Sequence, residues 1–244
     1  MSAPLFTIVT ATRNARAELK RTARSLAGQT FRDFEWIVID GDSSDGTKAL
    51  LSTLPHVSRY LSERDMGIAD AWNKGLALAS GTHVLILNAG DTYDPEMLAE
   101  MSRVVDEDHI TCCHARLMSE DGRLQGRFLS IPGRLWRGMH LAHNWCAVPR
   151  SAYLALGAYK HLQHAMDYEW FHRYYLRNGT RGFRVVDKTL GTYFLGGHSD
   201  VNAAAGFAAN ERIWVENGRP RWLARLLRYA YTAKHLRAAA QRKA

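Results

Sequence analysis

The chain has 244 residues, 46% of them hydrophobic, which suits one substantial α/β domain and excludes a largely disordered protein. Its net charge of +8 lies in residues 219–244, which contain eight Lys or Arg and no Asp or Glu, so the remainder holds 24 basic and 24 acidic residues. Because a nucleic-acid-binding domain more often carries its basic patch on the folded body, we expect no nucleic-acid partner. The first residues lack a signal-peptide pattern, and no run approaches the ~20 apolar residues of a membrane span, so we expect a cytoplasmic protein.

Strands and helices alternate through the first part of the chain. Apolar runs typical of buried strands occupy 5–10, 34–39, 57–61 and 83–87, and helical spacing of apolar residues occurs at 18–27, 48–54 and 68–79. We expect Gly81 to cap the carboxyl end of the third helix. The alternation predicts an α/β fold with a mostly parallel central sheet and helices on both faces.

Polar loops follow the first, second and fourth of these strands. Ligands of parallel sheets bind beyond the carboxyl ends of the strands. We therefore expect Asn14, Asp40 and Asp91, one from each loop, to gather at one crevice.

The second part of the chain is less regular. Strand-like runs occur at 109–115, 184–186 and 192–195, a hairpin or edge strand at 122–131, and helical spacing at 167–177. We expect these elements to extend the sheet.

Four segments occur in an order and spacing that resemble family 2 of the glycosyltransferases. They read TIVTATRN at 7–14, WIVIDGDSSDGT at 36–47, SERDMGIADAWNKG at 62–75 and LNAGD at 87–91. The resemblance is strong over 5–91 and thins toward 199. It implies a GT-A, Rossmann-like nucleotide-diphospho-sugar transferase domain over 1–218, with a nucleotide-sugar-binding half at 1–100 and an acceptor and catalytic half at 101–218. It also implies inverting transfer of a sugar to an acceptor hydroxyl, assisted by Mg²⁺ or Mn²⁺.

The resemblance places the donor nucleotide against the matched motifs. Asp40 falls at the position that contacts the base, although it is also a good turn residue. Asp65 falls at a second nucleotide-side carboxylate, and its alternative role is to start the following helix. The remaining donor-side candidates are Thr10, Thr12, Asn14, Lys74, Asn88 and Gly90.

The resemblance makes Asp91 the last carboxylate of an Asp-x-Asp-type metal motif. Asn88 and Gly90 stand where acidic residues often occur, so only one carboxylate remains. Mg²⁺ and Mn²⁺ prefer oxygen ligands, and a second ligand would have to come from elsewhere. His198 is the candidate, with an ordinary loop residue as the alternative.

The family's late acidic motif corresponds to Asp167, at the start of a predicted helix. The resemblance makes Asp167 the general base, whereas a carboxylate there is also favoured by the helix dipole alone. Glu169 is the fallback on the acceptor side. His143 and Trp145 match a segment that lines the acceptor pocket, and Trp145 would either stack on a sugar ring or pack in the core.

The segment 219–244 predicts a basic amphipathic helix. We expect an apolar face formed by Trp222, Leu223, Leu226, Leu227 and Ala230. The opposite, basic face would be formed by Arg221, Arg225 and Arg228. Such a helix suits an anionic membrane surface, here the inner face of the cytoplasmic membrane, and would fit a saccharide or lipid-linked acceptor in cell-surface polysaccharide or glycolipid synthesis. The alternative is a helix docked on the body.

Two other functions compete with sugar transfer. A nucleotidyltransferase would need a glycine-rich, basic phosphate loop after the first strand, and residues 10–14 contain neither a glycine nor a lysine. A non-catalytic nucleotide- or sugar-binding subunit of an assembly complex is compatible with the missing acidic residues at Asn88 and Gly90.

Overall fold

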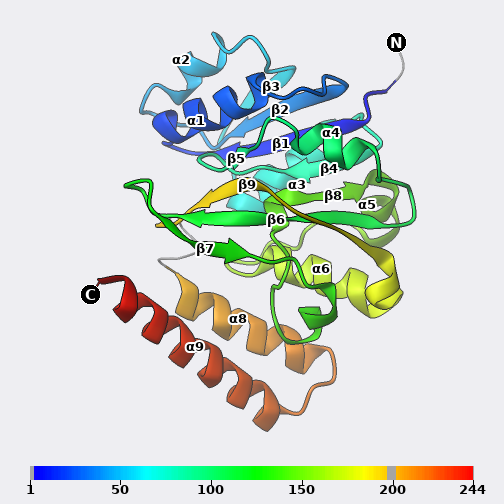
Figure 1. Cartoon of the computed structure of the whole chain (residues 1–244), viewed down its shortest axis with the longest axis vertical. Coiled ribbons are helices and arrows are strands. Elements are labelled where there is room, and N and C mark those ends of the chain that lie inside the picture. Colours follow the sequence, from blue (N-terminus) through cyan, green and yellow to red (C-terminus); the bar gives the residue numbers. More distant parts are fainter. Residues whose placement is uncertain (1–2, 197–201, 244) are drawn as a thin grey trace.

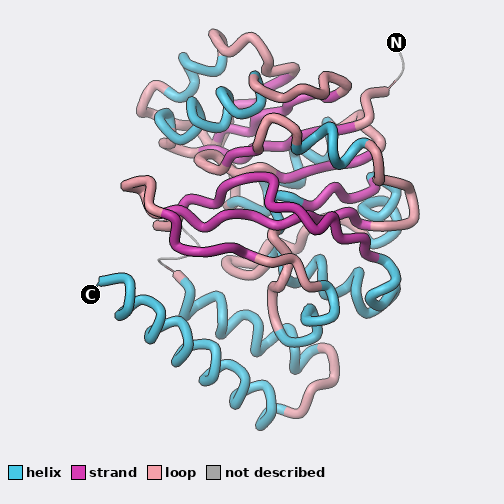
Figure 2. Tube along the Cα trace, in the orientation of Figure 1, coloured by secondary structure: helices cyan, strands magenta, loops and turns pink. Residues whose placement is uncertain are grey.

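The computed structural model describes residues 3–196 and 202–243. Its strands are β1 (Phe6–Thr12), β2 (Phe34–Asp40), β3 (Arg59–Ser62), β4 (His83–Ile86), β5 (Thr92–Tyr93), β6 (Ile110–Met118), β7 (Leu124–Phe128), β8 (Cys146–Pro149) and β9 (Phe183–Phe194). They form one sheet in the order β3-β2-β1-β4-β8-β6-β9-β5, with β7 paired to β6 (Figure 1). Helices cover this sheet, and a separate helical layer lies at the C-terminal end (Figure 2).

The first half has the alternating order that the sequence predicts. Its helices are α1 (Arg16–Ala27), α2 (Thr47–Leu51) and α3 (Ile68–Leu78), followed after β4 by α4 (Met97–Ser102). β3, β2, β1 and β4 are parallel neighbours, so their carboxyl ends share one edge. α3 lies very close to β1, because a Cβ on Gly75 would come within 2.2 Å of Val9 Cγ1.

The prediction that Gly81 caps α3 is wrong. The helix ends at Leu78, and its capping residue is Ala79 in an extended conformation. Gly81 is required for a different reason: a Cβ there would lie 2.7 Å from the backbone nitrogen of Thr7 on β1. The residue allows the chain to enter β4 directly beside β1.

The second half is mixed rather than parallel. Its helices are the 3₁₀ turns η1 (Pro132–Arg137), η2 (His143–Trp145) and η3 (Gly179–Gly182), and the α-helices α5 (Arg150–Leu156) and α6 (Met166–Asn178). β8 pairs antiparallel with both β4 and β6 and so joins the two halves. The runs at 184–186 and 192–195 belong to one strand, β9, which pairs parallel with β6 through two register shifts. The exposed Asp187 and Lys188 in its middle explain why the sequence shows two fragments.

The C-terminal layer is a pair of helices, α8 (Ala203–Glu216) and α9 (Arg221–Lys243), that lie side by side at the bottom of Figure 1. α9 is docked on the body, because Ala224 is fully buried and Leu227 and Tyr231 pack against the core. Within the described ranges, no helix is both long and apolar enough to cross a membrane.

The expected division of α9 into one apolar and one basic face is wrong. The helix carries two apolar stripes, and the body takes the one centred on Ala224, Leu227 and Tyr231. Arg228, expected on the solvated side, turns inward, with its Nε 2.6 Å from a Glu211 carboxylate oxygen of α8. The second stripe faces outward and contains Trp222, Leu226, Tyr229 and Leu236. The sequence prediction merged the two because both repeat at helical spacing.

Candidate functional site

A cavity of about 760 Å³ opens where the two halves meet. The first half contributes the ends of β1 and β4, including Thr12 and Asp91, and the second contributes Leu117 at the end of β6 and Asp167 at the start of α6. A cavity thus lies at the strand ends, but of the three residues expected to gather there only Asp91 lines it, and Asn14 and Asp40 do not.

Asp91 lies just beyond β4 and is only 6% exposed. Its Oδ2 accepts a hydrogen bond from Asn144 Nδ2, and its Oδ1 accepts one from the Phe194 backbone nitrogen at 3.2 Å. Asn88 joins the same network: its Oδ1 accepts from Trp72 Nε1 at 3.1 Å, and its Nδ2 lies 3.5 Å from Asn144 Oδ1. These contacts hold the carboxylate in a fixed position at the cavity wall.

This oxygen-rich corner fits a divalent metal that arrives with a diphosphate. The described residues contain no group of three or more His, Cys, Asp or Glu able to hold a metal ion. Mg²⁺ is commonly bound through one or two carboxylates together with substrate phosphates, and at this corner Asp91 is the carboxylate that would take this role. The predicted second ligand, His198, lies outside the described residues.

Asp40 ends β2 and Asp65 follows the neighbouring β3, but neither residue lines the cavity. Asp40 is fully buried, and its Oδ2 accepts hydrogen bonds from Ser62 Oγ at 2.7 Å and Ser43 N at 3.1 Å. Asp65 lies against the intervening Gly41, where a Cβ would come within 2.6 Å of its Oδ2. Gly41 thus lies between the two carboxylates, and a larger residue there would require the Asp65 side chain to move.

The other donor-side candidates are divided between the cavity and the fold. Thr12 and Gly90 line the cavity, and Thr12 Oγ1 is a buried hydroxyl without a hydrogen-bond partner in the described chain. Thr10 instead accepts a hydrogen bond from Trp36 Nε1 at 2.9 Å inside the sheet. Asn14 Oδ1 accepts from the Ser44 backbone nitrogen at 2.8 Å and so ties the first two loops together.

Lys74 does not face the cavity, contrary to its predicted role. Its Nζ lies 2.7 Å from a Glu63 oxygen and 3.1 Å from an Asp70 oxygen, and these contacts raise the pKa of the ammonium group. Because it is one turn away from Asp70 on α3, the lysine is satisfied locally. We assign it to the stability of the 62–75 segment.

Asp167 faces the cavity from the first turn of α6, with 28% of its side chain exposed. The preceding Ala165 has a left-handed backbone, φ 58°, which is unusual for a residue with a Cβ and is typical of functional sites. His143 Nδ1 lies 3.9 Å from Asp167 Oδ2. Burial lowers the pKa of His143, and the Asp167 carboxylate opposes this shift. Both side chains line the cavity, so His143 stands beside Asp167 at its wall.

Glu169 and Trp145 do not have the acceptor contacts predicted for them. Glu169 is 4% exposed, does not line the cavity, and lies 2.7 Å from Lys160 Nζ and 3.1 Å from Arg173 Nε. It faces away because two residues along a helix rotate the side chain by about 200°. Trp145 borders the cavity but is 2% exposed and packs edge-on against Tyr93, which leaves no ring face for a sugar.

Sequence reasoning missed Asn144 and Trp72 as site residues. Asn144 lies within the segment 143–145, and its spacing from Asp91 gives no hint of contact. Trp72 follows the apolar spacing of α3 and therefore resembles a core residue, although it borders the cavity and donates to Asn88.

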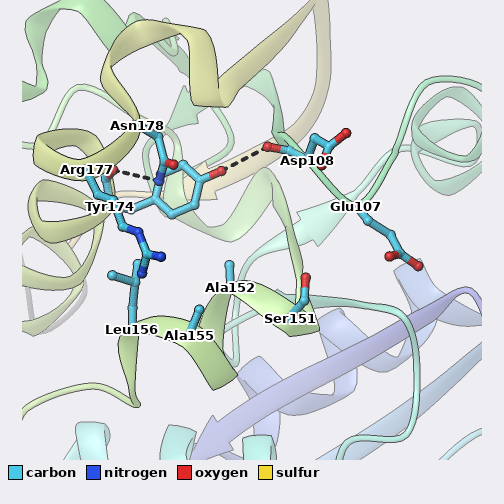
Figure 3. Close-up of a pocket in the computed structure, with 9 residues that line it drawn as sticks. All are labelled: Glu107, Asp108, Ser151, Ala152, Ala155, Leu156, Tyr174, Arg177 and Asn178. Atoms are coloured by element: carbon cyan, nitrogen blue, oxygen red, sulfur yellow. Dashed lines mark hydrogen bonds between the residues drawn. The ribbon is translucent and has the colours of Figure 1, made fainter.

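A second, smaller cavity of about 250 Å³ lies at the opposite end of β6 (Figure 3). Tyr174 stands in its centre and donates a hydrogen bond to the Asp108 carbonyl at 3.3 Å, while Asn178 donates to the Tyr174 carbonyl at 3.1 Å. None of the four sequence motifs reaches this cavity, so it is separate from the candidate site.

Comparison with known proteins decides the family. The model of glycosyl transferase family 2 matches residues 7–180, which includes every site residue described above except the end of β9 and the C-terminal helices. The chain belongs to glycosyl transferase family 2. The resemblance seen in the four motifs is thereby confirmed.

Curated relatives of this family 2 chain are similar over part of its length. A "PGL/p-HBAD biosynthesis glycosyltransferase" of Mycobacterium bovis is 37% identical over 112 residues, 44% of each protein. The putative teichuronic acid biosynthesis glycosyltransferase TuaG of Bacillus subtilis is 29% identical over 141 residues, 54% of this chain and 55% of TuaG. The match therefore covers about half of each relative or less.

Solved structures confirm the GT-A fold of the family 2 chain. S. aureus TarS 1–349 in complex with UDP-GlcNAc superposes with a TM-score of 0.68 at 16% identity, covering 96% of this chain and 72% of TarS 1–349. The mannosyltransferase PcManGT of Pyrobaculum calidifontis, in complex with GDP-Man and Mn²⁺, gives a TM-score of 0.66 at 16% identity, covering 99% of this chain and 76% of that protein.

Proposed function

We propose that the protein transfers a sugar, with inversion, from a nucleotide-diphospho-sugar to an acceptor hydroxyl. The observation that carries this proposal is that Asp91 and Asp167, from opposite halves of the chain, face one cavity of about 760 Å³. The relatives named for glycolipid and teichuronic acid synthesis, and the neighbours bound to UDP-GlcNAc and GDP-Man, support the same chemistry.

In the proposed reaction, Asp167 accepts the proton of the acceptor hydroxyl while that oxygen bonds to the anomeric carbon. The bond between this carbon and the diphosphate oxygen breaks, and the nucleoside diphosphate leaves with the electron pair. His143, whose Nδ1 lies 3.9 Å from Asp167 Oδ2, is the side chain beside the proposed base. Asp40 and Asp65 flank the proposed base groove, and Thr12, Asn88 and Gly90 border the donor end of the cavity.

Asp91 would hold a divalent metal, Mg²⁺ or Mn²⁺, with His198 as a proposed further ligand. When bound, the metal neutralises charge that develops on the diphosphate. Asn144 and the Phe194 backbone nitrogen keep the Asp91 oxygens oriented.

The first test is thermal stabilisation by UDP, GDP, dTDP and CDP, each with and without Mn²⁺. A ligand that binds only the folded state raises the melting temperature by mass action. We expect one nucleotide to stand out, with a Mn²⁺-dependent part that Asp91→Ala removes. If no nucleotide shifts the melting temperature, sugar transfer is contradicted and a non-catalytic role replaces it.

We further propose that the protein works in the cytoplasm, bound peripherally to the inner face of the membrane through α9, on a saccharide or lipid-linked acceptor. Support comes from the outward stripe of α9, which contains Trp222, 69% exposed, with Leu226, Tyr229 and Leu236. Arg221 and Arg225 lie exposed on the same helix and complement anionic headgroups, each contributing about 1 kcal/mol near the surface.

Vesicle sedimentation tests this docking. We expect the protein to sediment with phosphatidylglycerol-containing vesicles, and the triple substitution Trp222→Ser, Leu226→Ser and Tyr229→Ser to release it. Leu154→Ser, at a residue that is 77% exposed on α5, is the matched control and should leave binding unchanged. Equal sedimentation of the triple variant and the control contradicts a membrane role for α9.

A further inference from the structure

The C-terminal helices do more than cover the body, because they form one wall of the candidate site. α8 contributes Ala203, Gly206, Phe207 and Asn210 to the cavity, and α9 contributes His235. All of these residues lie beyond residue 180, where the family match ends. The family model therefore does not describe this wall.

The lining of the cavity combines apolar and polar side chains. The sheet and its loops contribute Leu117, Phe128, Met139 and Leu195, and the helices contribute Asn210 and His235 beside Phe207. Phe207 completes the lining from α8, held by the rings of Tyr231 and His235 of α9, each with its centroid 5.9 Å away. The apolar part of this lining suits a hydrocarbon, which gains free energy by leaving water.

Two further observations concern this wall: there is open space beside Gly206, and the side-chain oxygen of Asn210 has no hydrogen-bond partner in the described chain. A Cβ built on Gly206 would meet no atom of the described residues within 4 Å, so there is space beside the helix at this lining position. Asn210 Oδ1 also faces this region and is buried without a hydrogen-bond partner in the described chain. A buried amide oxygen of this kind is costly unless a ligand donates to it.

We infer that the α8–α9 wall binds an apolar, hydrocarbon part of the acceptor next to the hydroxyl that receives the sugar. The inference rests on the proposed function and deepens it, because it names an amphiphilic acceptor rather than a purely polar saccharide. The same helix pair thus has two roles: its inner side holds the acceptor, and the outer stripe of α9 faces away from the cavity.

Binding of two glycosides with the same head group tests this inference. Methyl β-D-glucopyranoside and n-octyl β-D-glucopyranoside, the latter below its micelle-forming concentration, would be titrated calorimetrically into the full-length protein. We expect the octyl compound to bind at least about tenfold more tightly, because several methylenes leave water. Equal binding of the two compounds, or no binding of the octyl compound, overturns the inference.

Substitutions at the wall locate the octyl site. Gly206→Phe should fill the open space and weaken octyl binding about tenfold, and Phe207→Ala should weaken it by removing the lining ring. Ala204→Leu, on the exposed side of the same helix, is the matched control. Octyl binding that Gly206→Phe and Phe207→Ala both leave unchanged overturns the inference. Stabilisation by nucleotides is measured in parallel for all these variants. Because the proposed nucleotide site lies away from the α8–α9 wall, nucleotide stabilisation should persist in every variant, and its loss would count against sugar transfer rather than against the acceptor wall.

Discussion

The two halves of the molecule build the site in different ways. In the first half, consecutive parallel strands end at the same edge, so the loops that follow them meet there through topology alone. In the second half, the contributions come from a 3₁₀ turn, the start of α6, the end of β9 and the α8–α9 pair. The first arrangement leaves its mark in the sequence as motifs, whereas the second depends on packing between elements that share no local pattern.

Asp167→Asn should have the largest effect, because it removes the proposed base from the second half and leaves the donor half intact. We expect kcat for nucleoside diphosphate release to fall by about 10²–10⁴-fold, with nucleotide stabilisation unchanged. Asp187→Asn, at a carboxylate that is 99% exposed, is the control and should retain full activity. Near-normal turnover in Asp167→Asn would contradict the role of Asp167 as the general base.

Glu169→Gln tests whether Glu169, on the same helix as Asp167, contributes to stability rather than to activity. It should destabilise the protein by about 2 kcal/mol in urea unfolding, because the buried Glu169 side chain loses the charge that strengthens its contacts with Lys160 and Arg173. Activity of the folded fraction should remain within about twofold of the original. The exposed Glu216→Gln serves as control. A large loss of activity without a loss of stability would indicate instead that Glu169 contacts the acceptor.

The second half should also be sensitive to acid through His172. Burial first, and the Arg219 charge next, lower the pKa of His172 from 6.5 to about 4. In the window from pH 6.5 down to 4 the unfolded chain binds the proton and the folded protein does not, so stability falls as the pH falls. Protonation of His172 should lower the free energy of unfolding by about 2 kcal/mol. This is less than the whole pKa shift implies, because solvent partly screens the charge on the imidazole.

Urea unfolding at pH 7.5 and pH 5 measures this effect. His172→Phe should reduce the difference in stability between the two pH values, and His56→Phe, at an exposed loop position, should not. The same pH dependence in wild type and His172→Phe would show that other groups, such as carboxylates, cause the whole acid response.

Asn144→Ala should have the smallest effect of the four and tests the link between the halves. Asn144 donates to Asp91 across the cavity, so its loss should weaken Mn²⁺-dependent nucleotide stabilisation about tenfold and leave the metal-independent part unchanged. Asn217→Ala, at the exposed end of α8, provides the comparison. If both parts weaken equally, Asn144 supports the fold of the cavity rather than the orientation of Asp91.

The sequence by itself determined the architecture of the first half and the family. Apolar runs located its strands and helical spacing its helices. Polar loops after parallel strands predicted a crevice lined by Asn14, Asp40 and Asp91, and of these Asp91 lines the cavity. These features are local, because each depends on residues within one strand–loop–helix unit. The placement of Asp167 at the start of a helix was also read correctly, since its motif and the helical spacing coincide.

Only the tertiary structure decided which side chains reach the cavity. Lys74 and Glu169 carry suitable chemistry, but neighbouring charges bind them elsewhere, and Trp145 is enclosed by the sheet. Asn144, and the Phe207 wall built by α8 and α9, enter the site through contacts between distant segments. In α9 both apolar stripes repeat at helical spacing, so the sequence does not show which of them packs against the body; in the structure it is the stripe centred on Leu227. Such choices depend on the shape and charge of the partner surface, which no local spacing records.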